Sequence, residues 1–219
     1  MAENDGSETR AKRKQAVILR AAEEVFLTSG YLGASMDDVA SRASVSKQTI
    51  YKHFGDKESL FHAVVTNVVE TADPEREEQA FVVGDDLRAD LRRIARRLLR
   101  GVMQDRVLQL RRVVIAEAVR FPNLGRRFYE LGPGSTIDKF ARAVEDLRDR
   151  GLVETADPTM AAEQLNWLIL SPALNRAMLL GDRHGLTPHD LDRYADAGVE
   201  TFLRAHGTPD LGERDDLRL

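Results

Sequence analysis

A run of hydrogen-bonding side chains between residues 46 and 53 has the most specific chemistry in this sequence. Its polar members are Ser46, Lys47, Gln48, Thr49, Tyr51, Lys52 and His53. Such side chains donate to, or accept from, base edges and phosphate oxygens. Ile50 and Phe54 interrupt the run four residues apart, which is helical spacing, so both should turn inward and leave the polar side chains outside. The pattern predicts a short helix that fits the major groove of DNA.

Two further helices are expected in front of this run, and they are needed to hold it in place. The first has one apolar stripe, formed by Val17, Ile18, Ala21, Ala22, Val25 and Phe26. Gly30 follows where a left-handed cap would end that helix, and Ser35 with Asp38 is a start signal for a second, short helix. A tight connection at Ser44 then leads to the helix over residues 46–54. Three helices connected in this way predict a helix-turn-helix.

The remainder of the chain also has the pattern of helices. Apolar residues recur at helical spacing in each segment, and Gly, Pro or Asp stands at most boundaries. The expected helices cover residues 57–69, 87–98, 107–119, 137–147, 158–180 and 188–206. Pro172 is expected to kink its helix, and Gly132-Pro133-Gly134 to break the chain. Because no alternating strand pattern and no internal repeat is found, the predicted fold class is all-α.

The charge of the chain is unevenly distributed. Its net charge is −4, which by itself argues against a nucleic-acid partner. Residues 10–57, however, contain nine lysines and arginines against five acids, a local charge of +4 that leaves −8 for the rest. A basic head on an acidic body is expected of a protein that binds DNA without adhering to it everywhere.

Composition and motifs argue against several other classes. The absence of cysteine excludes disulfides, thiol catalysis and thiolate metal sites. No apolar run approaches the roughly 18 residues of a membrane span, and the polar start is no secretory signal, so no membrane partner and a cytoplasmic location are expected. The histidines lack HExxH spacing, and there is no GxSxG, P-loop or dinucleotide turn, so we predict neither an enzyme nor a cofactor or metal. A helical interaction module without DNA binding stays open, and a steep salt dependence of DNA binding would exclude it.

Residues 17–65 resemble the N-terminal domain of the TetR family of regulators. The match covers residues 18–22, 26, 30–31, 34–40, 43–54 (ASVSKQTIYKHF) and 56–60. Ser44 departs from the family pattern, in which Gly or Asn is commoner at the turn. Residues 114–175 resemble, more weakly, regulators related to AefR and AcrR. The resemblance implies an all-helical two-fold homodimer, with palindromic double-stranded operator DNA and a small-molecule effector as partners.

The resemblance also implies roles for individual residues. Base-edge contacts are expected from Lys47, Gln48 and Thr49, and phosphate contacts from Ser35, Ser46, Tyr51, His53 and Lys57. Lys12 and Arg13 are expected to form a basic arm near the DNA backbone or minor groove. By side-chain chemistry, Gln48 suits adenine and Lys47 suits guanine. The alternatives are that Ser35 only caps its helix and that Lys57 is only a solvated charge.

Four segments are expected along the chain: a disordered tail at 1–9, a helix-turn-helix domain at 10–57, an effector-binding and dimerisation domain at 58–207, and a frayed tail at 208–219. Helical bundles bind ligands between facing helices, among apolar side chains with a few polar groups. The candidate ligand-binding residues are Met103, Ile115, Phe128, Tyr129, Phe140, Asn166, Trp167 and Leu170. Asn166 with Trp167 offers a hydrogen bond beside a stacking surface, whereas ordinary core packing is the alternative for each residue alone.

The last two long helices are expected to form the dimer seam, as in the family. The residues predicted for it are Ala161, Leu165, Leu168, Ala173, Ala177, Leu191, Ala195, Gly198, Val199 and Phe202. The dense arginines of residues 88–112 either attract an anionic ligand or form a solvated face paired with acids, and the second interpretation is favoured. The expected function is a repressor released from its operator by a ligand, with activation left open.

Overall fold

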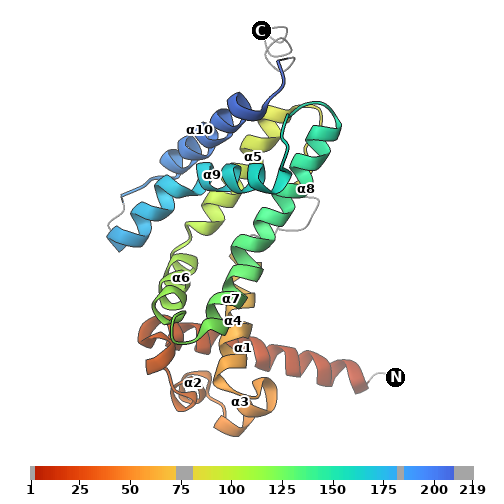
Figure 1. Cartoon of the computed structure of the whole chain (residues 1–219). Coiled ribbons are helices and arrows are strands. Elements are labelled where there is room, and N and C mark those ends of the chain that lie inside the picture. Colours follow the sequence, from red (N-terminus) through yellow and green to blue (C-terminus); the bar gives the residue numbers. More distant parts are fainter. Residues whose placement is uncertain (1–2, 73–80, 182–184, 210–219) are drawn as a thin grey trace. The chain divides into compact units, whose positions relative to one another are not determined.

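The computed structural model describes residues 3–72, 81–181 and 185–209, and these ranges are almost entirely helical. The elements are α1 (Glu3–Gly33), α2 (Met36–Ala43), α3 (Lys47–Phe54), α4 (Lys57–Ala72), α5 (Leu87–Val102), α6 (Asp105–Glu117), α7 (Pro122–Tyr129), the π-helix η2 (Glu130–Gly134), α8 (Ser135–Asp149), α9 (Pro158–Leu180) and α10 (Pro188–His206) (Figure 1). An isolated antiparallel bridge joins Val153 and Gly207, and the described ranges contain no strand. The predicted all-α fold class is confirmed. None of the helices in these ranges has both the length and the apolar content to cross a membrane.

The chain divides into two compact units. Unit 1 holds the residues up to Thr71 together with Gln109–Leu131, and unit 2 holds Ala72–Leu108 together with Gly132–Leu219. This division differs from the expected boundary after residue 57, because α4 and a returning segment of α6 and α7 belong with the first helices.

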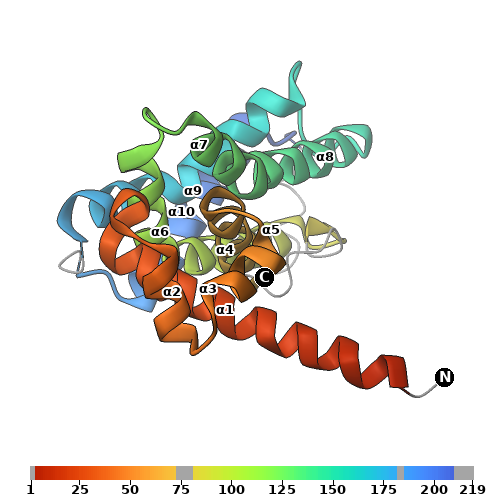
Figure 2. The same ribbon diagram turned by 90° about the horizontal axis from the view of Figure 1, so that it is seen from below.

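Large apolar side chains from α1, α3 and α4 form the core of unit 1. The most deeply buried of these, each at most 1% exposed, are Ile18, Phe26, Ile50, Leu60 and Phe61. Figure 2 shows α2 and α3 side by side next to α1, in agreement with the contacts between α1 and α2 and between α2 and α3. The core therefore fixes α3 from behind, as the sequence pattern predicts.

Two helix boundaries in unit 1 differ from the prediction. Gly30 has φ 71° and ψ 174°, so the backbone leaves helical geometry where a cap was expected, but a further turn extends α1 to Gly33. At its other end α1 begins at Glu3, so most of the expected tail at 1–9 belongs to the helix. Of the expected C-terminal tail, Thr208 donates its backbone N–H to the carbonyl of Leu152 at 3.2 Å, and residues 210–219 lie outside the described ranges.

The starts predicted for the last two helices, at residues 158 and 188, are confirmed. The Asp157 carboxylate accepts the backbone N–H of Met160 at 3.0 Å, with proline next in sequence at the start of α9. Thr187 and Asp190 form a reciprocal capping box at the start of α10. These bonds satisfy backbone donors that the first turn of a helix leaves without a partner. The long helix α9 continues through Pro172, where a kink was expected, and ends at Leu180 with Gly181 as its C-cap, which is the predicted end.

The break predicted at Gly132-Pro133-Gly134 is wrong. The chain stays helical there, as the π-helix η2, and α8 follows directly. Pro133 has no backbone N–H, so it donates no hydrogen bond in this turn, whether the spacing is that of an α-helix or of a π-helix. The hydroxyl of Thr136 adds a hydrogen bond to the carbonyl of Gly132 at 3.1 Å.

In unit 2, α5, α8, α9 and α10 share one apolar core, and α9 packs closely on α10. The closest approach is at Gly198, where an added Cβ would lie 2.9 Å from the backbone carbon and oxygen of Leu168. Most residues expected in a dimer seam are buried in this core, including Leu165, Ala195, Val199 and Phe202 at 1% exposure or less. The prediction that these residues form the dimer seam is wrong, because the small side chains let α9 and α10 of the same chain pack closely on each other.

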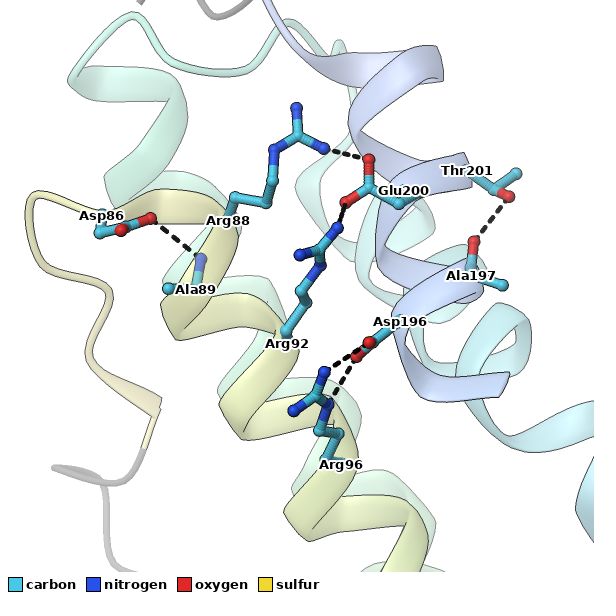
Figure 3. A network of polar contacts seen from close by, with 9 residues as sticks. All are labelled: Asp86, Arg88, Ala89, Arg92, Arg96, Asp196, Ala197, Glu200 and Thr201. Carbon is cyan, nitrogen blue, oxygen red and sulfur yellow. Dashed lines mark hydrogen bonds and ion pairs between the residues drawn. The ribbon is translucent and has the colours of Figure 1, made fainter. Parts of the chain in front are cut away.

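The arginines of α5 are paired with acids of α10. Arg88 and Arg92 both donate to Glu200, the latter at 2.9 Å, and the Nε of Arg96 donates to Asp196 at 2.7 Å (Figure 3). One turn further along, the Nε of Arg100 donates to Asp192 at 2.9 Å. A four-residue repeat on each helix produces this ladder, which confirms the favoured interpretation of paired charges for these arginines.

Gly198→Ala should destabilise the protein, by about 1–3 kcal/mol, because the new methyl group meets backbone that cannot move aside. The sign is informative, since glycine to alanine inside a helix normally stabilises by about 0.5–1 kcal/mol. Gly132→Ala is the matched control, because nothing lies within 4 Å of its added Cβ. Urea unfolding of both variants measures the effect, and equal stability of the two would contradict the close helix contact.

Candidate nucleic-acid interface

The polar side chains singled out in the sequence lie on the outside of α3. Ile50 is fully buried and Phe54 half-buried, whereas Lys47, Gln48 and Tyr51 are exposed. Thr49 and His53 are half-buried at the margins of this face. The helix therefore presents amine, amide and hydroxyl groups outward while its apolar side anchors it.

The turn between α2 and α3 depends on an unusual backbone conformation at Ser44. Its φ of 53° and ψ of 43° are left-handed, and within the described chain Ser44 is the non-glycine residue at positive φ. The backbone N–H of Val45 donates to the carbonyl of Ala40 at 3.0 Å and ties the turn to α2. Gly or Asn, the commoner types at this position in the family, would adopt this left-handed conformation at lower energetic cost than Ser44.

Both serines predicted to contact phosphate act as helix caps. Ser35 Oγ accepts the N–H of Asp38 at 3.1 Å and donates its own proton to the Asp38 carboxylate at 2.6 Å. Ser46 Oγ accepts the N–H of Thr49 at 3.2 Å and lies 2.8 Å from the Thr49 hydroxyl. A hydroxyl has a single proton to donate. A phosphate contact from Ser35 would therefore require its bond to Asp38 to break.

Lys57 is folded onto unit 1 instead of extending into solvent. Its ammonium lies 4.8 Å from the centre of the Tyr31 ring and 3.3 Å from the carbonyl oxygen of Leu32. Burial lowers the pKa of Lys57 and raises the pKa of the Tyr31 hydroxyl. The predicted phosphate contact stays a prediction, and it would require this side chain to leave the aromatic ring.

Tyr31 also joins the first helices to the returning segment of unit 1. Its ring packs edge-on against two phenylalanine rings, with 5.1 Å between the ring centres of Tyr31 and Phe61 and 4.9 Å between those of Tyr31 and Phe121. Next to it, the Glu117 carboxylate accepts the N–H of Leu32 at 3.3 Å. The end of α6 and the start of α7 thus pack on the helix-turn-helix. The sequence pattern did not predict this role, because the contacts of Phe121 are made with residues far away along the chain.

Two ion pairs lie on the surface around α2. Lys47 Nζ donates to Asp37 Oδ2 at 2.8 Å, and this hydrogen bond raises the pKa of Lys47. Arg42 donates to Glu24 at 2.6 Å. The expected arm residues Lys12 and Arg13 lie on α1 and are exposed. The face is therefore a mixture of paired charges and uncharged hydrogen-bonding groups.

The candidate ligand-binding residues do not form a single set. Met103, Phe140, Asn166 and Leu170 are buried in unit 2, where Asn166 is 1% exposed. Neither polar atom of the Asn166 side chain has a hydrogen-bond partner within the described chain. Buried amides are almost always paired, so this one is an exception that needs a physical reason.

The other four candidates have different surroundings. Phe128, Tyr129 and Ile115 belong to unit 1, where Phe128 is buried beneath the Arg111 guanidinium while Tyr129 and Ile115 are exposed. Trp167 belongs to unit 2 but is 46% exposed. It lines an open groove between α9 and α10, formed by Gln164, Trp167, Leu168, Ser171, Pro172, Thr201, Phe202, Ala205 and His206. Helical periodicity alone could not distinguish the buried candidates from the exposed ones. Asn166 and Trp167, for example, are adjacent in sequence, yet Asn166 is buried and Trp167 lines the groove.

Comparison with known proteins gives matches along most of the chain. The family model described as "AefR-like transcriptional repressor, C-terminal domain" matches residues 89–208, and the model "Bacterial regulatory proteins, tetR family" matches residues 18–64. A TetR-family transcriptional regulator of Mesorhizobium loti MAFF303099 is 38% identical, with a TM-score of 0.80 over 91% of this chain and 99% of its own. The flavonoid-responsive regulator FrrA is 32% identical, with a TM-score of 0.74 over 90% of this chain and 99% of its own.

A curated relative matches over a shorter stretch. The transcriptional activator FasR of Mycolicibacterium smegmatis is 40% identical over 65 residues, which is 30% of this chain and 30% of FasR. Together with the architecture of the two units, the family matches define what kind of protein this is. The chain belongs to the TetR family of transcriptional regulators, with an N-terminal helix-turn-helix DNA-binding domain and a C-terminal AefR-like helical domain, and is not an enzyme.

Proposed function

We propose that this protein is a dimeric repressor that acts in the cytoplasm, binds a palindromic operator through α3 and is released by a small molecule. The observation that supports the proposal most directly is the outer face of α3, where Lys47, Gln48 and Tyr51 are exposed while Ile50 is fully buried. A helix presented in this way can enter a major groove without exposing apolar surface.

The proposed DNA contacts follow the chemistry of that face. Lys47, Gln48 and Thr49 occupy the first turn of α3 and would contact base edges, with the Gln48 amide suited to adenine. Tyr51 and His53 lie further along the helix and would donate to phosphates. Ser46 could also donate to a phosphate, whereas Ser35 and Lys57 would join them only after the rearrangements described above. The backbone N–H groups at the start of α3 add further donors for a phosphate.

Replacement of Gln48 and Tyr51 by alanine should weaken operator binding by at least about 30-fold, because each base or phosphate contact contributes about 1–3 kcal/mol. The site is first obtained by selection from a random duplex library with the parent protein. Asn175→Ala, which removes an exposed amide from unit 2, is the control. Fluorescence anisotropy over a range of salt concentrations measures the affinities, and unchanged binding by the double variant would rule out α3 as the reading helix.

A second copy of the chain is the proposed occupant of the Trp167 groove. The groove is formed by the outer sides of α9 and α10, and its aromatic and small side chains suit a self-complementary two-fold contact. The proposed dimer contact thus uses the outer sides of the same two helices that the sequence pattern assigned to the dimer seam. Trp167, predicted to bind the effector, is proposed instead to contact the second copy of the chain.

Trp167→Glu should weaken dimerisation by about 30-fold or more, since a buried tryptophan at the centre of an interface typically contributes at least 2 kcal/mol. Val119→Glu is the matched control, because Val119 is an apolar residue of unit 1 that is 95% exposed. Sedimentation velocity over a dilution series reports the association constant. If both variants dimerise like the parent, the groove is not the interface.

The effector is proposed to bind in the interior of unit 2, with Asn166 as its polar anchor. An amide that is 1% exposed and has no partner within the described chain reduces stability unless a ligand completes its hydrogen bonds. FrrA, which is similar over 90% of this chain, is flavonoid-responsive, so a polyphenolic molecule is the first class to test. Repression is favoured over activation because the AefR-like repressor model matches residues 89–208, whereas the similarity to the activator FasR covers 30% of the chain.

Asn166→Leu should stabilise the ligand-free protein by about 1–3 kcal/mol, because it removes a buried polar group that has no partner. The same variant should keep its operator affinity but no longer be released by a flavonoid that releases the parent protein. Asn175→Leu, an exposed amide on the same helix, should do neither. Thermal unfolding and operator release are measured with a panel of flavonoids. A loss of stability in Asn166→Leu would indicate that the amide is satisfied and is no anchor.

A further inference from the structure

The ion pair between Lys47 and Asp37 lies at the point where the two helices of the helix-turn-helix begin. Lys47 is the first residue of α3, and Asp37 lies in the first turn of α2. The two side chains remain 46% and 70% exposed although their charged groups are 2.8 Å apart. The pair is therefore formed on the surface that the proposed function turns toward DNA.

Asp37 has no part in capping α2. The neighbouring acid, Asp38, is held by the Ser35 hydroxyl at 2.6 Å and completes the cap. A carboxylate on a DNA-facing surface repels phosphates, so Asp37 lowers affinity for DNA of any sequence. Such a residue needs a compensating contact, and a cytosine amino group is the donor on a base edge that a carboxylate accepts.

The two charged groups match the major-groove edge of one G·C pair. Guanine offers its O6 and N7 as acceptors, and cytosine offers its N4 amino group as a donor beside them. O6 and N4 are joined by a base-pairing hydrogen bond of about 2.9 Å, close to the 2.8 Å between Lys47 Nζ and Asp37 Oδ2. A lysine has three protons, so Lys47 can keep its bond to Asp37 and still donate to guanine.

We propose that Asp37 is a specificity-determining residue, and that Lys47 and Asp37 together read one G·C base pair in each half of the operator. The inference rests on the proposed operator contact of α3 and adds a second reading residue from α2. A C·G pair in the same place would reverse this order, with the cytosine N4 donor facing the lysine and the guanine O6 acceptor facing the carboxylate. Both Lys47 and Asp37 would therefore disfavour that base pair.

Asp37→Asn tests the proposal in the full-length protein. The parent protein selects its site from a random duplex library, and affinities are then measured for that site and for a site with the G·C pair reversed to C·G. The parent should prefer G·C by about tenfold or more. The variant should lose most of this preference, bind random duplex DNA more tightly, and show a salt dependence steeper by about one phosphate equivalent.

A modified duplex isolates the contact itself. Replacing the cytosine of that pair by a pyrimidin-2-one nucleotide removes the N4 amino group, which should weaken parent binding about tenfold and leave Asp37→Asn binding unchanged. Glu24→Gln is the matched control: it breaks the other exposed ion pair of this region, Glu24 with Arg42, and should change neither base preference nor response to the modified base. Thermal unfolding verifies that each variant is folded.

The possible results separate the inference from the proposed function. If Asp37→Asn binds all duplexes more tightly but keeps the full G·C preference, Asp37 only restrains Lys47 and the inference is overturned. An equal effect of the modified base on parent and variant overturns it as well. If the parent selects no sequence and shows no salt-dependent binding, the proposed function fails, and the inference fails with it.

Discussion

The burial of Ile50 is the contact on which the polar outer face of α3, the proposed reading face, depends. Because Ile50 is fully enclosed by the core of unit 1, α3 has a single rotational setting, and its neighbours in sequence are forced outward. The capping bond from Ser46 fixes where the helix begins, and the left-handed turn at Ser44 fixes the direction from which it arrives. A rotation of α3 would bury lysine or glutamine and expose isoleucine, so the core determines the polar face as firmly as the polar residues do.

The same core explains why unit 1 includes residues from far along the chain. Tyr31 contacts Phe61 and Phe121, and Glu117 accepts a backbone proton from Leu32. The helix-turn-helix is thus packed against the end of α6 and the start of α7. The helix α6 begins among the residues of unit 2 and ends among those of unit 1, so it is one continuous helix shared by the two units.

Several charged residues of the described ranges are arranged in pairs. The α5 arginines meet acids at a matching interval on α10, and Lys47 meets Asp37 on the surface of unit 1. Partly exposed pairs contribute modest stability, typically below about 1 kcal/mol each, but they set which residues can lie opposite one another. In unit 2 they favour one alignment of α5 along α10. In unit 1 the pair gives the reading face a donor and an acceptor in a fixed order.

The sequence by itself determined most of the helices, the caps at Ser35, Asp157 and Thr187, and the outer face of α3, because these depend on local periodicity and on hydrogen bonds between residues three or four apart. It also indicated the turn at Ser44, the one departure from the family pattern. Only the tertiary structure decided that the small residues of α9 and α10 pack within one chain, that Trp167 faces a groove while Asn166 is buried, and that Lys57 covers Tyr31. These features depend on which helices meet, and a helical repeat shows that a residue faces a neighbour without showing which neighbour it is.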